Sequence, residues 1–324
     1  MPIPRPSVLL SSVLAALLLA APAAARDKKD PKDETAHEFA FVGNSAAKLA
    51  GDEGEDRLKR ALKETSEKSL DFVVLTGIKG DKESCGDRLY QKRRDLVDGA
   101  RRPVIVSLAG SDWTGCRNSA GRTNAIERLN RLRELLYGEP TSLGEDKLPV
   151  SRLSTSPRFR SYAENAHWQV GKVVYATINL PAGNNHFLPA AGRNSEYEDR
   201  MVANRFWLNR LFAIARNDKA EALVLFAEGD ARPLLQEEAK GLRGLLRREP
   251  AVQDGFAETR RQIQARAGKF KGKVLLVDSG ALKGKQPVIE WRGNLGQLSV
   301  GEKAVEVEVS SKDGAVFSVG DAKR

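Results

Sequence analysis

The sequence predicts an α/β fold, with strands and helices combined in one domain. Short segments that are nearly continuous in Val, Ile, Leu and Phe recur along the chain, which is typical of strands buried on both faces. Between them lie stretches whose apolar residues recur at helical spacing. Near the C-terminus the pattern changes to short alternating segments separated by glycines. Strands that alternate with helices and are followed by hairpins indicate a mixed sheet system.

Residues 1–25 have the features of a secretory signal peptide. Arg5 belongs to a short N-terminal region, residues 8–20 are mostly apolar, and three alanines precede Arg26. The apolar stretch is too short to span a membrane, and no other run reaches the necessary length. A retained N-terminal anchor helix is the alternative. We expect an exported protein, periplasmic or secreted, with no transmembrane segment after removal of the signal.

The elements of the domain follow in order. Residues 26–38 are expected to form a charged, flexible leader, because they contain a proline and lack apolar periodicity. A single domain is expected over residues 39–320. Its strands are predicted at residues 39–42, 72–75, 104–108, 173–180, 222–226 and 274–277. Its helices are predicted at residues 56–70, 87–100, 124–137 and 198–216. From residue 287 onward, alternation with glycine turns predicts a C-terminal antiparallel hairpin region.

The cysteine content and the charge restrict the class of protein. Cys85 and Cys116 are the two cysteines, and an oxidising compartment favours a disulfide between them, worth about 3 to 4 kcal/mol. Two buried free thiols are the alternative. The formal net charge of +10 favours anionic partners, although spread-out charge is also typical of a solvated surface. Because no RNA-binding aromatic signature, zinc-finger spacing or basic zipper is present, nucleic acid is not favoured as a partner.

Polar residues follow the predicted strands at positions where an α/β protein presents its chemistry. Gly77, Ile78 and Lys79 follow the second strand, and Gly110, Ser111 and Asp112 follow the third. Further fragments continue in order along the chain. They are Gly43, residues 76–79, Cys85 with Asp87, residues 102–103, 113–114, Cys116, 127–129, 162–168, 184–185, 196–197, 203–204 and 207–208.

In their order and spacing, these fragments resemble the calcineurin-like metallophosphoesterases, in particular an exported bacterial branch. The resemblance covers most of the chain after the leader. It implies a four-layer α/β/β/α sandwich in which loops at the strand ends hold two metal ions. In that chemistry a metal-bridging hydroxide attacks phosphorus, and the two cations neutralise charge on the phosphoryl oxygens.

Compared with the pattern that the resemblance implies, this sequence lacks the expected metal ligands. Asn44 stands where an aspartate follows the first glycine, and Ile78 stands where the carboxylate that bridges both metals is expected. Ser111 and Asp112 replace the usual ligand turn, and Asp278 with Ser279 replaces a histidine turn. Hard divalent cations need several anionic or imidazole donors at fixed geometry. We therefore expect the dinuclear site to be lost.

The three histidines do not repair this loss. His37 is expected to be solvent-exposed in the leader, and His167, just before a strand, is expected to be structural. His186 lies on a strand-end loop, where it could bind a metal or a phosphate oxygen. The remnant site is accordingly predicted to contain eight residues: Asn44, Lys79, Ser111, Asp112, Asn184, Asn185, His186 and Asp278.

The preferred hypothesis is an exported, noncatalytic protein that requires no cofactor and has no assigned catalytic residue. It would use the strand-end crevice or its basic surface to bind a partner, such as an envelope protein, or an anionic, phosphorylated ligand. The alternative is a divergent metal-dependent phosphoric ester hydrolase, in which Asp112, His186 and Asp278 rebuild a site for one divalent metal ion, with Asp81 or Asp230 as further candidates. A third hypothesis is a purely structural, envelope-associated basic protein without a pocket at the strand ends.

Overall fold

A computed structural model describes Met1 and residues 36–44, 47–49, 51–189, 192, 194–235, 253–282, 284–310 and 317–320. The expected signal peptide, apart from Met1, and the expected leader up to residue 35 lie outside the described residues. The helices and strands belong to the unit Asp33–Arg324.

The domain begins earlier than the sequence indicates. Strand β1 spans His37–Val42, and the His37 side chain is only 5% exposed. Its Nε2 atom is hydrogen-bonded to the Tyr175 hydroxyl at 2.5 Å. The expectation of a solvent-exposed His37 in a flexible leader is therefore wrong. Because side chains alternate along a strand, His37 points to the same buried side as Phe39 and Phe41.

Five strands form the first sheet, in the order β12-β11-β1-β2-β3. Strands β1, β2 and β3 are mutually parallel, whereas β11 is antiparallel to β1 and β12 is antiparallel to β11. The bounds of the other four strands are Phe72–Thr76 for β2, Val104–Ser107 for β3, Ala304–Val309 for β11 and Phe317–Val319 for β12.

Seven strands form the second sheet, in the order β4-β5-β6-β7-β8-β10-β9. Strands β6, β7, β8 and β10 are parallel, and antiparallel strands complete both edges. The bounds are Ser151–Arg152 for β4, Ala166–Val170 for β5, Val173–Thr177 for β6, Ala222–Ala227 for β7, Lys273–Asp278 for β8, Glu290–Arg292 for β9 and Leu295–Ser299 for β10.

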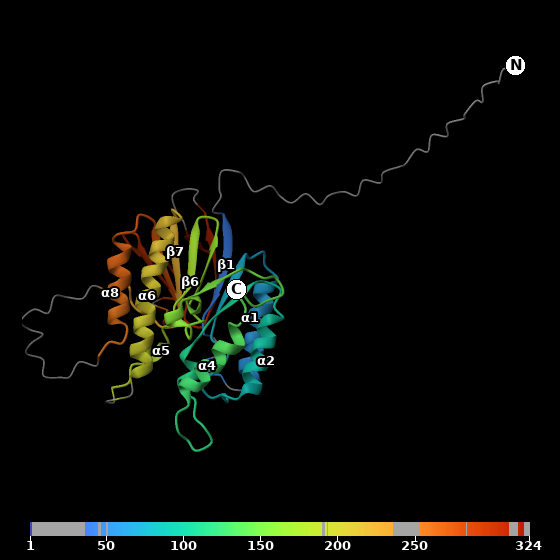
Figure 1. Cartoon of the computed structure of the whole chain (residues 1–324), viewed down its shortest axis with the longest axis vertical. Coiled ribbons are helices and arrows are strands. Elements are labelled where there is room, and N and C mark those ends of the chain that lie inside the picture. Colours follow the sequence, from blue (N-terminus) through green and yellow to red (C-terminus); the bar gives the residue numbers. More distant parts are fainter. Residues whose placement is uncertain are drawn as a thin grey trace, which may run out of the picture. The chain divides into compact units, whose positions relative to one another are not determined.

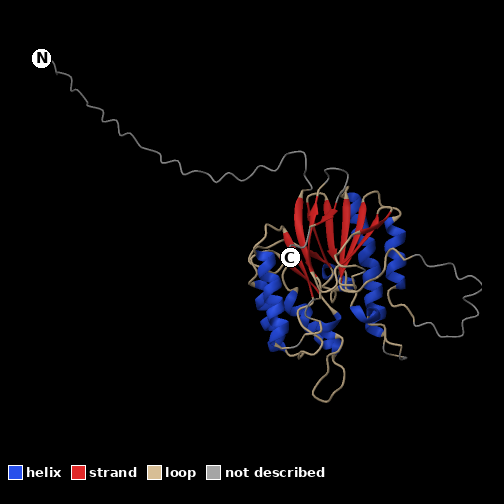
Figure 2. Ribbon diagram, turned by 180° about the vertical axis from the view of Figure 1, so that it is seen from behind, coloured by secondary structure: helices blue, strands red, loops and turns tan. Residues whose placement is uncertain are grey.

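Helices pack against both sheets (Figure 1, Figure 2). Helices α1, α2 and α4 share a buried cluster with the first sheet, and α6 and α8 share one with the second. The bounds are Asp52–Ser66 for α1, Asp87–Asp98 for α2, Gly110–Trp113 for α3, Ala125–Leu136 for α4, Ala182–Asn185 for α5, Ser195–Asn217 for α6 and Ala257–Ala267 for α8. Two single-turn 3₁₀ helices span Leu153–Thr155 and Pro157–Phe159.

A third buried cluster contains side chains from both sheets. Phe39 and Phe72 of the first sheet lie beside Tyr175 and Phe226 of the second. The ring centroids of Phe39 and Phe72 are 5.2 Å apart and those of Phe39 and Tyr175 are 5.4 Å apart. Aromatic pairs at such distances add to the free energy gained by burying their area. The two sheets therefore pack face to face through aromatic side chains.

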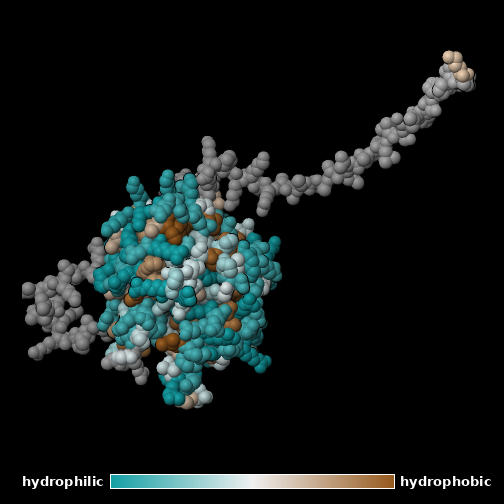
Figure 3. Space-filling view, in the orientation of Figure 1, coloured by the Kyte–Doolittle hydropathy of each residue, from teal (hydrophilic) through white to brown (hydrophobic). Residues whose placement is uncertain are grey.

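The α/β fold class predicted from the sequence is confirmed. All six predicted internal strands and all four predicted helices are present, with shifts of a few residues at their ends. The expected C-terminal antiparallel hairpin region is confirmed, because β9 pairs with β10 and β11 pairs with β12, both antiparallel. The two pairs belong to different sheets, and β11 also pairs with β1. Among the described helices, none is long and apolar enough to cross a membrane. Hydrophilic side chains predominate on the face shown in Figure 3.

Candidate functional site at the carboxyl ends of the strands

Loops from both sheets meet at the carboxyl ends of the parallel strands, where they form a hydrogen-bonded cluster around Glu228. Glu228 directly follows β7 and is 5% exposed. Its Oε1 accepts a hydrogen bond from Asn44 Nδ2 at 2.7 Å. Its Oε2 accepts hydrogen bonds from the backbone amides of Gly110 at 2.6 Å and Ala182 at 2.7 Å. Hydrogen bonds to an ionised carboxylate are among the stronger ones in proteins.

Asn44 extends this cluster to two further loops. Its Nδ2 also lies 3.2 Å from Ser111 Oγ, and its backbone amide donates to Ser279 Oγ at 3.2 Å. Asn44 follows β1, so this one residue connects loops that follow β1, β3, β7 and β8. We call Asn44, Gly110, Ser111, Ala182, Glu228 and Ser279 the Glu228 cluster.

The close packing of this cluster explains the glycine after β2. Gly77 has a φ of +70°, and a Cβ atom at this position would lie 2.9 Å from Ala109 Cβ and 3.0 Å from Asn44 Oδ1. Only glycine fits both the backbone conformation and the available space. The loop after β2 is therefore pressed against Asn44.

Asp112 organises the loops that follow β2 and β3. Its side chain is fully buried, with Oδ1 accepting from the backbone amides of Ile78 at 2.9 Å and Lys79 at 3.1 Å. Its Oδ2 accepts from the amide of Ala109 at 2.8 Å. Ile78, at the position where the family resemblance implies a bridging carboxylate, thus contributes a backbone donor while its side chain lies in the apolar core.

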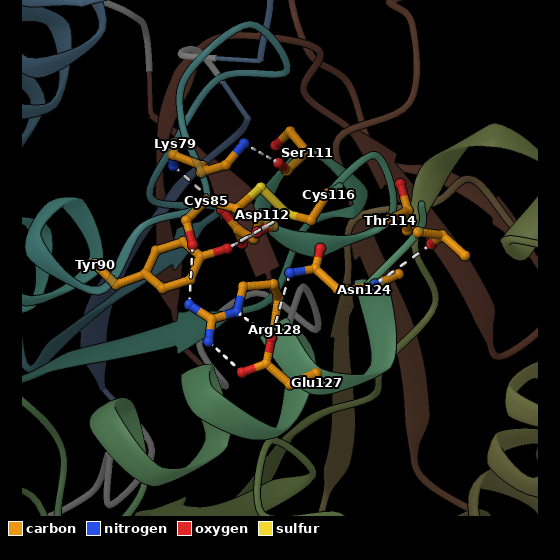
Figure 4. The surroundings of a disulfide bond; sticks show 12 residues. Lys79, Cys85, Tyr90, Ser111, Asp112, Thr114, Cys116, Asn124, Glu127 and Arg128 are labelled. Atoms are coloured by element: carbon orange, nitrogen blue, oxygen red, sulfur yellow. Dashed lines mark hydrogen bonds and ion pairs between the residues drawn. A yellow bond between two sulfur atoms is a disulfide. The ribbon is translucent and has the colours of Figure 1, made fainter. Parts of the chain in front are cut away.

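A buried ammonium group lies beside Asp112. Lys79 is 1% exposed, and its Nζ donates to the carbonyl oxygen of Ser111 at 2.6 Å (Figure 4). The same Nζ donates to the carbonyl oxygen of Gly80 at 2.7 Å. Burial lowers the pKa of the Lys79 ammonium, and the charge of Asp112 opposes that effect. This loop therefore holds a cationic side chain of its own.

The disulfide predicted between Cys85 and Cys116 is confirmed, and it closes the same region (Figure 4). The two Cα atoms are 5.8 Å apart and are separated by 31 positions in sequence. Tyr90 donates from its hydroxyl to the carbonyl oxygen of Asp112 at 2.7 Å, and Arg128 donates to the carbonyl oxygen of Cys85 at 3.1 Å. The disulfide and these two side chains fix the loops that carry Lys79 and Asp112.

Asp278 belongs to a separate acidic pair. Its Oδ1 accepts from the amide of Gly280 at 2.8 Å, and its Oδ2 accepts from Gln297 Nε2, also at 2.8 Å. Gln297 Nε2 lies 2.6 Å from Asp230 Oδ1 as well, so one amide holds both carboxyl groups. The neighbouring Ser279, rather than Asp278 itself, contacts Asn44.

Three buried carboxyl groups have raised pKa values. Burial raises the pKa of Asp112 to about 6 and that of Glu228 to about 6, although the hydrogen bonds that both accept act in the opposite direction. Burial, together with the charge of Asp230, raises the pKa of Asp278 to about 7. These groups therefore exchange protons near neutral pH.

The loop after β6 places its three predicted site residues differently. Asn184, Asn185 and His186 all have left-handed backbones, with φ values of 59°, 56° and 52°. Asn184 Oδ1 accepts from the amide of Gly255 at 2.8 Å, and Asn185 Oδ1 accepts from Arg200 at 2.5 Å. The side chains of both asparagines therefore anchor the loop to helix α6 and to the segment before α8.

His186 packs its ring against Trp113, with the ring centroids 4.9 Å apart, and burial lowers the pKa of its imidazole. The structure thus brings Asn44, Lys79, Ser111 and Asp112 together. It directs Asn184, Asn185, His186 and Asp278 to other partners.

These residues do not fit a metal centre of the kind that the resemblance implies. Asp112, His186 and Asp278 each have a different set of partners. Among the described residues, no group of three or more His, Cys, Asp or Glu side chains is placed to hold a metal ion. Both oxygens of Glu228 are already occupied by donors of the protein itself.

Glu228 was not among the residues expected from the sequence. A signal for it was available, because the acidic residue immediately follows the buried strand ALVLFA, as polar residues follow β2 and β3.

Comparisons with known proteins assign no family. No protein-family model matches the chain, and no curated protein matches it. Among the solved structures to which it is similar is GAP50, described as the anchor in the inner membrane complex of Plasmodium. The sequence identity is 12%, the match covers 88% of each chain, and the TM-score is 0.41. Similarity at this level assigns neither a fold family nor a function.

Proposed function

We propose that this protein is an exported, noncatalytic binding protein built on a scaffold of the metallophosphoesterase type. Two sheets that pack face to face, each with helices on its other side, support a four-layer α/β/β/α sandwich. The disulfide supports residence in an oxidising compartment. The Glu228 cluster is the observation on which the proposal depends.

The Glu228 cluster takes the place of a metal site in this proposal. To become a ligand, Glu228 would have to release Asn44 Nδ2 and the amides of Gly110 and Ala182. Each buried donor left without a partner costs about 1 to 3 kcal/mol. Lys79 supplies a positive charge in the adjacent loop, which further disfavours a cation nearby. The hydrogen bonds hold together the loops that metal ions would otherwise hold.

Of the two kinds of ligand considered, a partner protein is favoured over a phosphorylated ligand in the crevice. The carboxyl groups of Glu228 and Asp112 are buried among the loops at the strand ends, and ionised carboxylates repel anions. Lys79 points its ammonium at two carbonyl oxygens of the protein and so does not offer it to a ligand. Binding is therefore assigned to the outer surface.

Metal analysis combined with a phosphodiester assay tests the proposal. The purified chain, incubated with Mn²⁺, Fe²⁺ or Zn²⁺ and then desalted, should retain far less than one metal ion per chain. It should also hydrolyse bis(p-nitrophenyl) phosphate no faster than buffer does. Inorganic phosphate should not raise the melting temperature, since a ligand that binds only the folded state raises it.

A matched variant makes the test sharper. Glu228→Gln keeps the shape of the side chain and removes its charge, so it should behave like the parent protein in both assays. Stoichiometric metal, together with saturable hydrolysis that Asp112→Asn abolishes, would overturn the proposal in favour of a divergent phosphoesterase.

A further inference from the structure

Large apolar side chains remain exposed on, and just before, the last strand of the seven-stranded sheet. Val288 is 67% exposed and Trp291 is 38% exposed, and all three residues of β9 are exposed. β9 is the terminal strand of its sheet. We call residues 288–292 the β9 edge.

The hairpin register determines which backbone groups of β9 face outward. Arg292 pairs with Leu295 across a two-residue turn, and Trp291 pairs with Gly296. In a hairpin of this kind the pair next to the turn is hydrogen-bonded and the following pair is not. The N–H and C=O groups of Trp291 therefore point away from β10. In the part of the chain that the structure describes, no other backbone group bonds to them.

One face of the β9 edge is apolar. The Trp291 ring covers Gly296, where a Cβ atom would lie 2.7 Å from the ring. Phe317 of β12 lies on the same side, with a ring-centroid distance of 6.3 Å, and the Lys273 Nζ is 4.8 Å from the Trp291 ring centroid. Since β12 ends the five-stranded sheet, the terminal strands of both sheets contribute to this face.

The other face carries Glu290 and Arg292 together with the exposed Val288, and two hollows lie along it. Because side chains alternate along a strand, Glu290 and Arg292 point opposite to Trp291. Arg292 lines a hollow of about 550 Å³ together with Gln264 and Asn294. Glu290 lines a second hollow, of about 240 Å³, together with Gln297.

Positive charge surrounds this edge. Within the described ranges, none of the four cations on or next to it forms an ion pair with an acidic side chain; these are Lys273, Lys285, Arg292 and Lys303. Positive charge alone is a common protection of sheet edges against aggregation. The exposed side chains of Trp291 and Val288 are not expected at an edge that is only protected against aggregation. They indicate an edge that accepts another strand.

We propose that the β9 edge binds an extended segment of another polypeptide, in which apolar residues alternate with acidic ones. The segment adds as a strand next to β9, forms hydrogen bonds with the backbone of Trp291, and directs its apolar residues toward Trp291 and its acidic residues toward Arg292. The inference rests on the proposed function only in treating the chain as a binding protein. Its test measures peptide binding, whereas the proposed function is tested by metal content and turnover.

A peptide titration tests this inference. The probe is a fluorescein-labelled peptide of alternating valine and aspartate with blocked ends, added to the purified full chain and followed by fluorescence anisotropy. Saturable binding is expected. N-methylation of alternate peptide amides, which removes the strand donors, should weaken binding by about tenfold or more.

A charge exchange identifies the surface. Arg292→Glu should lower the affinity for the valine–aspartate peptide by about tenfold and raise the affinity for a valine–lysine peptide. Arg60→Glu, an exposed change on α1, is the matched control and should alter neither affinity. The inference is overturned if the first peptide fails to bind, if the N-methylated peptide binds equally well, or if Arg292→Glu behaves like the control.

A second copy of the chain is the competing occupant. Antiparallel pairing of two β9 strands would place Glu290 opposite Arg292 but would also bring the two Lys273 side chains together. Sedimentation equilibrium should therefore show a monomer over the concentrations used for the titration. A dimer that Arg292→Glu dissociates would overturn the inference.

Discussion

The Glu228 cluster and the β9 edge differ in how they satisfy their polar groups. In the cluster, a buried carboxylate receives three hydrogen bonds from loops of both sheets. At the edge, the backbone groups of the exposed Trp291, in a three-residue strand, point away from the fold. The difference indicates that the polar groups at the strand ends contribute to stability, whereas the polar groups left open lie at the end of a sheet.

Removal of the Glu228 carboxylate should have the largest effect. Glu228→Ala leaves Asn44 Nδ2 and two backbone amides buried without their acceptor, so the free energy of unfolding should fall by about 3 to 5 kcal/mol. Glu228→Gln should cost much less, because its carbonyl can still accept and the Asn44 amide can turn to accept from the new NH₂ group. Urea denaturation compares the two variants. Equal losses would show that the hydrogen bonds do not hold the loops.

Stability should depend on pH through Asp278. An unfolded aspartate loses its proton near pH 4, whereas burial and Asp230 hold the pKa of Asp278 at about 7. The folded state therefore binds more protons between these values, and stability is lost as pH rises from about 4 to about 7, by about 2 to 4 kcal/mol. Glu228 and Asp112 contribute in the same direction.

Asp278→Asn tests this dependence. The variant should be more stable than the parent protein at neutral pH and should show a flatter pH profile in thermal unfolding. Glu64→Gln, which removes an exposed carboxylate on α1, is the control and should leave the profile unchanged. The prediction would be contradicted if the parent protein gained stability between pH 4 and pH 7 and if Asp278→Asn and Glu64→Gln showed the same slope of stability against pH.

Loss of the disulfide should lower the free energy of unfolding by a similar or smaller amount. The bridge closes a loop of 31 positions, so Cys85→Ala with Cys116→Ala should lower the free energy of unfolding by about 2 to 4 kcal/mol. Reduction of the parent protein with a dithiol should have the same effect, whereas it should not change the double variant. Denaturation curves with and without the reductant measure both. A double variant as stable as the oxidised parent would show that the loops are held by Tyr90 and Arg128 instead.

Substitutions at the β9 edge should have the smallest effect on stability. Arg292 is exposed and has no acidic partner in the described part of the chain, so Arg292→Glu should change the free energy of unfolding by less than about 0.5 kcal/mol. The melting temperature of this variant provides the measurement. A large loss would mean that the edge, like the Glu228 cluster, is part of what stabilises the fold.

Much of the fold could be predicted from the sequence, because buried parallel strands leave continuous apolar runs. Helix α8 gives no such signal, since Arg260, Gln262 and Thr259 occupy buried positions on it and interrupt the apolar period. The pairing of β11 with β1 was also not predictable, because the local alternation of β11 does not specify a partner elsewhere in the chain.

The candidate site was predictable only in part. Asn44, Lys79, Ser111 and Asp112 follow strands directly, and the parallel arrangement brings them together. Asn184 and Asn185 have polar side chains on a loop that follows a strand, as expected for site residues. Their left-handed backbone conformations, however, direct these side chains to Gly255 and Arg200. Only the three-dimensional path of that loop distinguishes a residue that lines a crevice from one that anchors its own segment.

The position of β1 has a consequence for the order in which the chain is assembled. β1 lies between β2 and β11, so the strand that opens the domain has a neighbour that is completed only at residue 309. A chain that emerges from its N-terminus can form β1, β2 and β3 early. One side of β1 then stays unpaired until nearly the whole chain has emerged. Contacts over such a sequence distance form slowly, so the first sheet is completed last.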